Sequence, residues 1–119
     1  MTDKKDWSKI LGSHYKTLEQ IFEEPPPDLT WTEIQGLLKE VEKEFQKDGV
    51  ATYVDDLVPG ENAINVQLNE VTKGTFYIAD PSKRVPKEYI RRLRKLLECV
   101  GVIPSASRPR GFRFLRSLQ

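Results

Sequence analysis

The residues best suited to chemistry in this sequence are cations in its C-terminal third. Between residues 83 and 98, seven Lys and Arg side chains are opposed only by Glu88 and Glu98. Such clusters neutralise phosphate groups, and each phosphate contact releases counterions and makes binding depend on salt. We therefore predict a surface for a polyanion such as RNA, with five residues as its main contacts: Lys83, Arg84, Lys87, Arg91 and Arg94.

The C-terminal tail adds arginine interleaved with aromatic residues. The run Arg110-Gly-Phe112-Arg113-Phe114 can stack on unpaired bases while its cations hold phosphates. Arg110 and Arg113 therefore complete the predicted nucleic-acid-binding set. Phe112 and Phe114 could equally dock onto the domain as an edge strand, and the pattern does not separate these two possibilities.

The charge of the chain is divided unevenly along its length. Residues 1–82 contain 8 Lys and Arg against 16 Asp and Glu, whereas residues 83–119 contain 11 against 2. This asymmetry indicates an electrostatic role for the basic part. Two alternatives remain open: the acidic part neutralises the basic part inside the fold, or the basic helix binds an acidic protein partner.

Residues for catalysis or for a cofactor are sparse. The single histidine, His14, lies at the start of the first expected helix, where we predict a solvated side chain. Cys99 is the only cysteine, so neither an internal disulfide nor a cysteine-based metal site is possible. Its apolar neighbours predict a buried, inert thiol. The sequence has no phosphate-binding loop, metal-spacing motif or nucleophile elbow, so we predict no catalytic residue, metal or cofactor.

Two helices are predicted in the first half of the chain. One covers residues 14–24 and ends at the triproline 25–27, because proline cannot donate a hydrogen bond within a helix. The other covers residues 30–48, where Thr30 and Glu33 match a capping box. Its apolar residues recur with helical spacing over four turns. They are Trp31, Ile34, Leu37, Leu38, Val41 and Phe45.

Three strands and a final helix are predicted after these. Alternating residues indicate strands at 50–54, 63–68 and 75–78, with a turn near Asn69-Glu70 and Lys73-Gly74 before the last strand. The last helix begins at Pro86 and ends near Val100, where Gly101 supplies the left-handed cap. Its expected buried stripe is Ile90, Leu93, Leu96, Leu97 and Val100. The predicted class is α+β, in the order helix-helix-β-β-β-helix, with a three-stranded antiparallel sheet and helices packed on one face.

The length of 119 residues predicts one domain. We assign residues 1–13 to a flexible N-terminus, 14–104 to the domain and 105–119 to the basic aromatic tail. No apolar run approaches the roughly 18 residues needed to cross a bilayer, and no signal peptide is recognisable. These features predict a cytoplasmic protein without a membrane partner.

Three segments of the chain resemble HicA-type toxins, small RNA-cleaving proteins of bacterial toxin–antitoxin systems. They are residues 14–22 (HYKTLEQIF), 29–38 (LTWTEIQGLL) and 87–102 (KEYIRRLRKLLECVGV), and the resemblance covers roughly residues 14–103. The family fold is similar to a double-stranded-RNA-binding domain. The resemblance implies an RNA ligand and an acidic, antitoxin-like protein as the alternative partner.

The chain departs from that family at one position that matters for chemistry. HicA-type toxins use a histidine on the sheet for RNA cleavage, and no histidine occurs between Val50 and Gln119. No catalytic residue can therefore be carried over from the family. The first hypothesis is an RNA-binding domain without nuclease activity, and the second is a protein-interaction module. A nuclease that uses other residues is the third.

Overall fold

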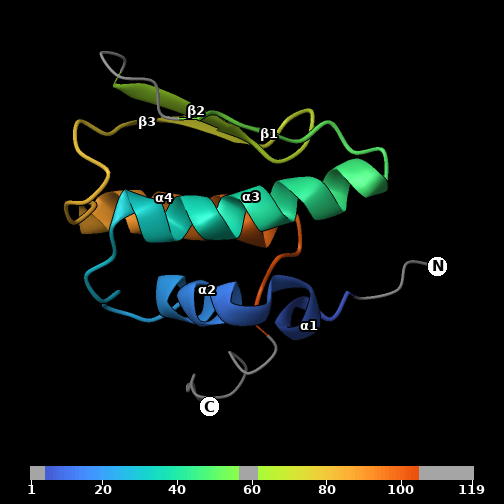
Figure 1. Cartoon of the computed structure of the whole chain (residues 1–119), viewed down its shortest axis with the longest axis horizontal. Coiled ribbons are helices and arrows are strands. Elements are labelled where there is room, and N and C mark those ends of the chain that lie inside the picture. The colour runs from blue at the N-terminus through green and yellow to red at the C-terminus, as the bar shows by residue number, and fades with distance from the viewer. Residues whose placement is uncertain (1–4, 57–61, 105–119) are drawn as a thin grey trace.

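A computed structural model describes residues 5–56 and 62–104, which form one sheet and four helices (Figure 1). The helices are α1 (Trp7–Leu11), α2 (Tyr15–Ile21), α3 (Trp31–Lys47) and α4 (Lys87–Cys99), with the short 3-10 helix η1 (Gly12–His14) between α1 and α2. The strands β1 (Tyr53–Val54), β2 (Ala63–Gln67) and β3 (Lys73–Tyr77) form an antiparallel sheet in the order β1-β2-β3. The predicted α+β class with a three-stranded antiparallel sheet is confirmed.

The elements stack in three layers (Figure 1). Helices α3 and α4 lie side by side beneath one face of the sheet, as predicted for helices packed on one face. Helices α1 and α2 pack on the far side of that helix pair and do not lie against the sheet. The middle layer is therefore covered on both sides, whereas no described element covers the outer face of the sheet.

Helix α3 forms as its sequence pattern predicts. The Glu33 backbone N–H donates to the Thr30 hydroxyl at 3.3 Å, and the Thr30 N–H donates to the Glu33 carboxylate at 2.9 Å, which completes the capping box. Gly49, with φ of 79°, follows the helix end in the left-handed region. All six residues of the predicted apolar stripe are buried: Trp31, Ile34, Leu37, Leu38, Val41 and Phe45.

The strands alternate as predicted, but their ends differ. β1 contains only Tyr53 and Val54; just before it, the Thr52 N–H donates to the Val50 carbonyl at 2.8 Å and the Thr52 hydroxyl donates to the Leu68 carbonyl at 3.1 Å. The predicted turn at Lys73-Gly74 is wrong, since both residues belong to β3. The Asn69-Glu70 part of the predicted turn is confirmed, because the Asn69 side chain accepts from two backbone N–H groups there, those of residues 71 and 72.

The N-terminal segment differs from its prediction. Residues 7–13 were assigned to a flexible N-terminus, yet α1 is helical and its Trp7 and Leu11 are 6% and 2% exposed. The Trp7 ring contacts Phe45 edge-on, with centroids 5.7 Å apart. The domain therefore begins before residue 14 and includes α1 in its core.

Two single residues also differ from their predicted environments. Cys99 is exposed, not buried, because the buried stripe of α4 is limited to Ile90, Leu93 and Leu97. His14 is half-buried rather than fully solvated. Its ring lies so close to Gly36 that a Cβ there would be 2.7 Å from the His14 Cε1 atom, so glycine permits this contact between η1 and α3.

Candidate polyanion-binding surface

The predicted cations at the start of α4 lie beside the chain that connects α2 to α3. Leu29 and Val85 are joined by a backbone hydrogen bond of 2.8 Å, which brings the two segments together. Arg84 Nη1 then lies 3.1 Å from the Asp28 carboxylate, and Lys87 Nζ lies 3.5 Å from the same group. The Lys87 ammonium also donates to the Pro26 carbonyl at 2.6 Å.

The predicted cations further along α4 bind the same connection. Arg91 places Nη2 and Nε at 2.8 and 3.2 Å from one carboxylate oxygen of Glu24. Arg94 places Nη1 3.0 Å from the other oxygen of Glu24. Arg94 also donates through Nε to the Ile21 carbonyl at 3.0 Å and through Nη2 to the Glu23 carbonyl at 2.6 Å. One arginine thus binds both the end of α2 and the carboxylate that follows it.

Four of the five main predicted contacts therefore have partners inside the chain. The acidic part of the sequence neutralises these cations, which was one of the two alternatives predicted from the charge asymmetry. The four residues are Arg84, Lys87, Arg91 and Arg94. The neutralising groups come from residues 21–28 and not from α3. Lys83 differs, because its exposed side chain makes no ion pair with any residue that the structure describes.

The arginine contacts stabilise the ionised form of Glu24. The hydrogen bond from Arg91, followed by that from Arg94, lowers the pKa of this carboxyl below its ordinary value of 4.5, against the smaller net effect of burial. The same cause acts on Asp28, whose pKa is lowered chiefly by Arg84. Both carboxylates are more than half exposed, so solvent weakens these pairs.

Acid is expected to weaken the attachment of Glu24 to α4. A carboxyl whose folded pKa lies below its unfolded pKa stabilises the fold fully above about pH 4.5, and the contribution is lost as the pH falls through the folded value. Glu24→Gln should therefore lose less stability between pH 5 and pH 3 than the wild type. Urea unfolding at a series of pH values measures this difference.

Glu23→Gln is the matched control, because Glu23 is an exposed neighbour with no ion pair among the described residues. Its stability should follow the wild-type pH dependence in this interval. Parallel curves for Glu24→Gln and the wild type would contradict the role given to Arg91 and Arg94.

A second set of cations remains without acidic partners in the described part of the chain. Lys73 begins β3, and Arg92 and Lys95 lie one turn apart on the exposed side of α4. Arg92 bridges the two elements, because its Nη2 donates to the Thr75 carbonyl at 2.9 Å. Its guanidinium also lies 4.5 Å from the centre of the Phe76 ring. We call Lys73, Arg92 and Lys95 the β3–α4 edge cations.

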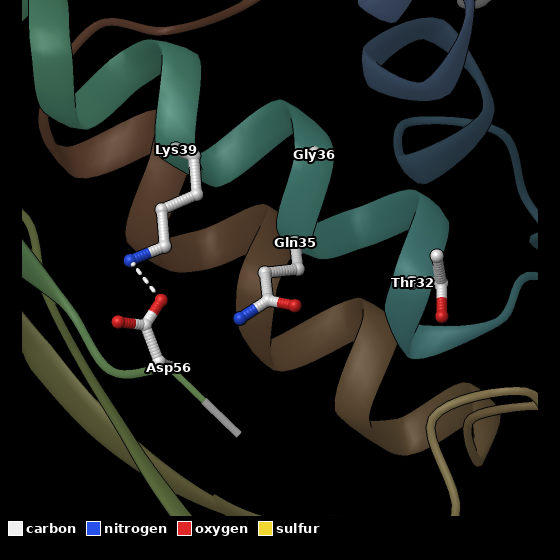
Figure 2. Close-up of a pocket in the computed structure, with 5 residues that line it drawn as sticks. All are labelled: Thr32, Gln35, Gly36, Lys39 and Asp56. Carbon is white, nitrogen blue, oxygen red and sulfur yellow. Dashed lines mark ion pairs between the residues drawn. The ribbon is translucent and has the colours of Figure 1, made fainter. Parts of the chain in front are cut away.

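A shallow groove separate from these cations lies beside α3. It is lined by Thr32, Gln35, Gly36, Lys39 and Asp56 (Figure 2). The Lys39 ammonium lies 2.8 Å from the Asp56 carboxylate and donates to the Val54 carbonyl at 2.7 Å. Gln35 donates to the Asp55 carbonyl at 3.2 Å. These polar groups connect α3 to the end of β1, so the groove offers little to a ligand and contains none of the predicted cations.

Together, the fold and these surfaces define a small three-layer α+β domain with a basic helix and a sheet whose outer face no described element covers. Comparison with known proteins gave no match to a family model, a curated protein or a solved structure. The resemblance to HicA-type toxins therefore stays a prediction. Within residues 5–56 and 62–104, no helix is long and apolar enough to cross a membrane.

The sequence pattern did not indicate every residue of this surface, and another predicted part of it lies outside the described residues. Lys73 was assigned to a turn, so its place beside α4 was not foreseen. Tyr53 and Tyr77 were not singled out, although strand alternation places both opposite the buried residues. Arg110 and Arg113, with the rest of the tail 105–119, lie outside the described residues.

Proposed function

We propose that this domain binds RNA, with phosphates held first by the β3–α4 edge cations. The observation that carries the proposal is that Lys73 of β3 and Arg92 and Lys95 of α4 are exposed without acidic partners among the described residues, and that Arg92 joins the two elements through the Thr75 carbonyl. Cations that are not already neutralised gain most from a phosphate, because no internal ion pair must be broken first.

Arg92 is well suited to this role because its guanidinium is held in place. It uses one N–H on the Thr75 carbonyl and lies over the rings of Phe76 and Tyr89, at 4.5 and 5.4 Å from their centres. Other N–H donors of this exposed side chain remain for a ligand. A fixed donor loses less conformational entropy on binding than a mobile one.

The cations at the start of α4 form the second part of the proposed surface. Arg84 and Lys87 share Asp28 in exposed ion pairs, which contribute little net stability. A phosphate can therefore replace that carboxylate, with Lys83 beside it. Arg91 and Arg94 make more hydrogen bonds, all to residues 21–24. In the proposal they bind phosphate only once Glu24 has moved away from them. Arg110 and Arg113 remain in the proposal from their sequence pattern alone.

The resemblance to HicA-type toxins favours RNA among the possible polyanions. The proposal includes binding and no cleavage, because the sequence lacks a histidine after Val50. Incubation of RNA with the purified protein tests this part. Intact RNA is the expected result, and cleavage by the wild type that is lost in a Lys87→Glu/Arg91→Glu variant would favour the nuclease hypothesis instead.

Charge reversal at the edge should weaken RNA binding. For Lys73→Glu/Lys95→Glu we expect the affinity for a fluorescein-labelled RNA to fall about tenfold, and the slope of log K against log salt to fall by roughly 1.4. Neither lysine has an ion pair among the described residues, so the fold should be retained. Fluorescence anisotropy between 50 and 300 mM salt measures both quantities.

Lys9→Glu/Lys16→Glu changes the net charge equally on α1 and α2, away from the edge, and should bind within about threefold of the wild type. Wild-type binding that is no weaker at 300 mM than at 50 mM salt would contradict the proposal. Equal loss in both double variants would show a general charge effect with no defined surface.

A protein-interaction module is the second candidate, and one observation favours it. The basic side of α4 already binds carboxylates of its own chain, those of Glu24 and Asp28. An acidic protein could present carboxylates to the same side chains. Purification without nuclease treatment separates the candidates: a high 260/280 nm absorbance ratio favours RNA, whereas a stoichiometric acidic protein without nucleic acid favours the module.

A further inference from the structure

The outer face of the sheet carries a defined set of exposed side chains. In β2 and β3 the buried residues Ile64, Val66 and Phe76 face α3 and α4, so the alternate residues face outward. No described element lies over this face (Figure 1). Its largest side chains are Tyr53 and Tyr77, which are 56% and 67% exposed.

The strand register orders these outward residues into rows. Tyr53 pairs with Gln67, which pairs with Lys73 on the next strand. Tyr77 pairs with Ala63 at the other end of β2. The two rows are four residues apart along β2, about 13 Å at the usual rise of a strand. Tyr53 and Tyr77 therefore lie at opposite corners of the face, far enough apart to hold two different rings.

The row between the tyrosines is a connected set of hydrogen bonds. The Asp55 carboxylate accepts from the Asn65 backbone N–H at 2.8 Å and from the Asn65 side-chain amide at 3.1 Å. The Thr75 hydroxyl donates to the Asn65 side-chain carbonyl at 2.7 Å. Hydrogen bonds from Asn65, above all that of its backbone, lower the pKa of Asp55. The carboxylate is thus already satisfied, and the middle of the face is rigid.

Charge is distributed unevenly around this face. The face itself carries Lys73 and the hydrogen-bonded Asp55, whereas Arg92 and Lys95 belong to the neighbouring helix α4, which Arg92 joins to β3 through the Thr75 carbonyl. A near-neutral, aromatic surface with cations along one edge complements a single strand of RNA, whose flat bases and charged backbone lie on different sides. A duplex does not fit as well, because its bases are stacked and paired.

We propose that the outer face of the sheet is a stacking platform for unpaired bases of single-stranded RNA, with Tyr53 and Tyr77 as the stacking residues. The backbone would follow β3, within reach of the edge cations. This inference rests on the proposed RNA-binding function and adds to it the class of RNA. Stacking on an aromatic ring changes affinity by about 5- to 150-fold per base.

The test compares two double variants on two probes. Tyr53→Ala/Tyr77→Ala should bind a fluorescein-labelled 12-nucleotide oligo(U) at least about tenfold more weakly than the wild type. Tyr53→Phe/Tyr77→Phe keeps both rings and removes only the hydroxyls, including the one that donates to Asp55, so it should bind within about twofold. A 12-base-pair RNA duplex should bind more weakly than oligo(U) and should respond little to either variant.

Three outcomes would overturn the inference. Unchanged oligo(U) affinity in the alanine variant, together with the loss expected for Lys73→Glu/Lys95→Glu, would leave RNA binding intact and refute the platform. A wild-type dimer that becomes monomeric in the alanine variant, with RNA binding unchanged, would assign the face to a second copy of the chain. Absence of binding to either probe by the wild type would refute the RNA function together with the platform.

Discussion

Replacing Trp7 by alanine is expected to lower the free energy of unfolding by about 3–5 kcal/mol. Trp7 is 6% exposed, and its ring contacts Phe45 at a centroid distance of 5.7 Å. Removal of the indole leaves a cavity between α1 and α3 and exposes the side of Phe45. Domains of this size have total stabilities of about 5–15 kcal/mol, so the variant should be close to unfolding at ordinary temperature.

Trp7→Ala leaves Trp31 as the only tryptophan, and Trp31 is fully buried in the core. Urea unfolding followed by Trp31 fluorescence therefore reports on the remaining domain. Lys9→Ala, on the exposed side of the same helix, should change stability by no more than about 0.5 kcal/mol. A loss below 1 kcal/mol in Trp7→Ala would mean that α1 is not part of the core, as the assignment of residues 1–13 to a flexible segment had implied.

The contrast between α3 and α1 explains which parts of the fold could be predicted. The signals of α3 are local: a capping box at Thr30 and Glu33, four turns of apolar spacing, and a glycine after the end. Helix α1 has only five residues, with Trp7 and Leu11 as its buried pair. Two apolar residues do not establish a period. Trp7 is buried against Phe45, far along the chain, and no local pattern contains that contact.

The strands likewise show one feature that a local pattern predicts and one that depends on a distant residue. Alternation predicted which residues of β2 and β3 face the helices, because the period of two is a property of the strand itself. The strand β1 begins after Thr52, whose hydroxyl donates to the carbonyl of Leu68, the residue that follows β2. A local pattern does not show whether a threonine pairs through its backbone or its side chain. The alternation of residues 50–54 therefore predicted a longer β1 than the structure has.

The charged surface shows why site residues are harder to predict than a helix. The sequence locates the cations, but it does not indicate which carboxylates reach them. Glu24 and Asp28 meet α4 only because the chain reverses between α2 and α3 and pairs with residues 84 and 85. The same kind of long-range contact places Arg92 on the Thr75 carbonyl of β3, without an acidic partner among the described residues. The charge imbalance thus correctly indicated a basic surface. Ion pairs formed in the tertiary structure occupy the cations near residues 21–28, so the cations without acidic partners among the described residues include those of β3 and the adjoining side of α4.

Arg94→Ala is expected to lower the free energy of unfolding by about 1–3 kcal/mol, because it leaves carbonyl groups without their donors. Ile21 is the last residue of α2, so no backbone N–H of the helix donates to its carbonyl. The Arg94 Nε donates to it instead, at 3.0 Å. The Glu23 carbonyl loses its 2.6 Å bond at the same time. The positive charge of Arg94 near the C-terminal end of α2 also interacts favourably with the helix dipole.

Two comparisons separate this role from a simple loss of charge. Arg94→Lys keeps the charge but not the planar fork that reaches both carbonyls, so it should lose most of the same stability. Lys95→Ala removes an adjacent exposed cation and should change stability by no more than about 0.5 kcal/mol. Hydrogen exchange should show faster exchange in α2 and little change in α3 for Arg94→Ala. If Arg94→Ala instead weakened RNA binding with unchanged stability and unchanged exchange in α2, Arg94 would belong to the binding surface, and the attachment of α2 to α4 would depend on its other contacts.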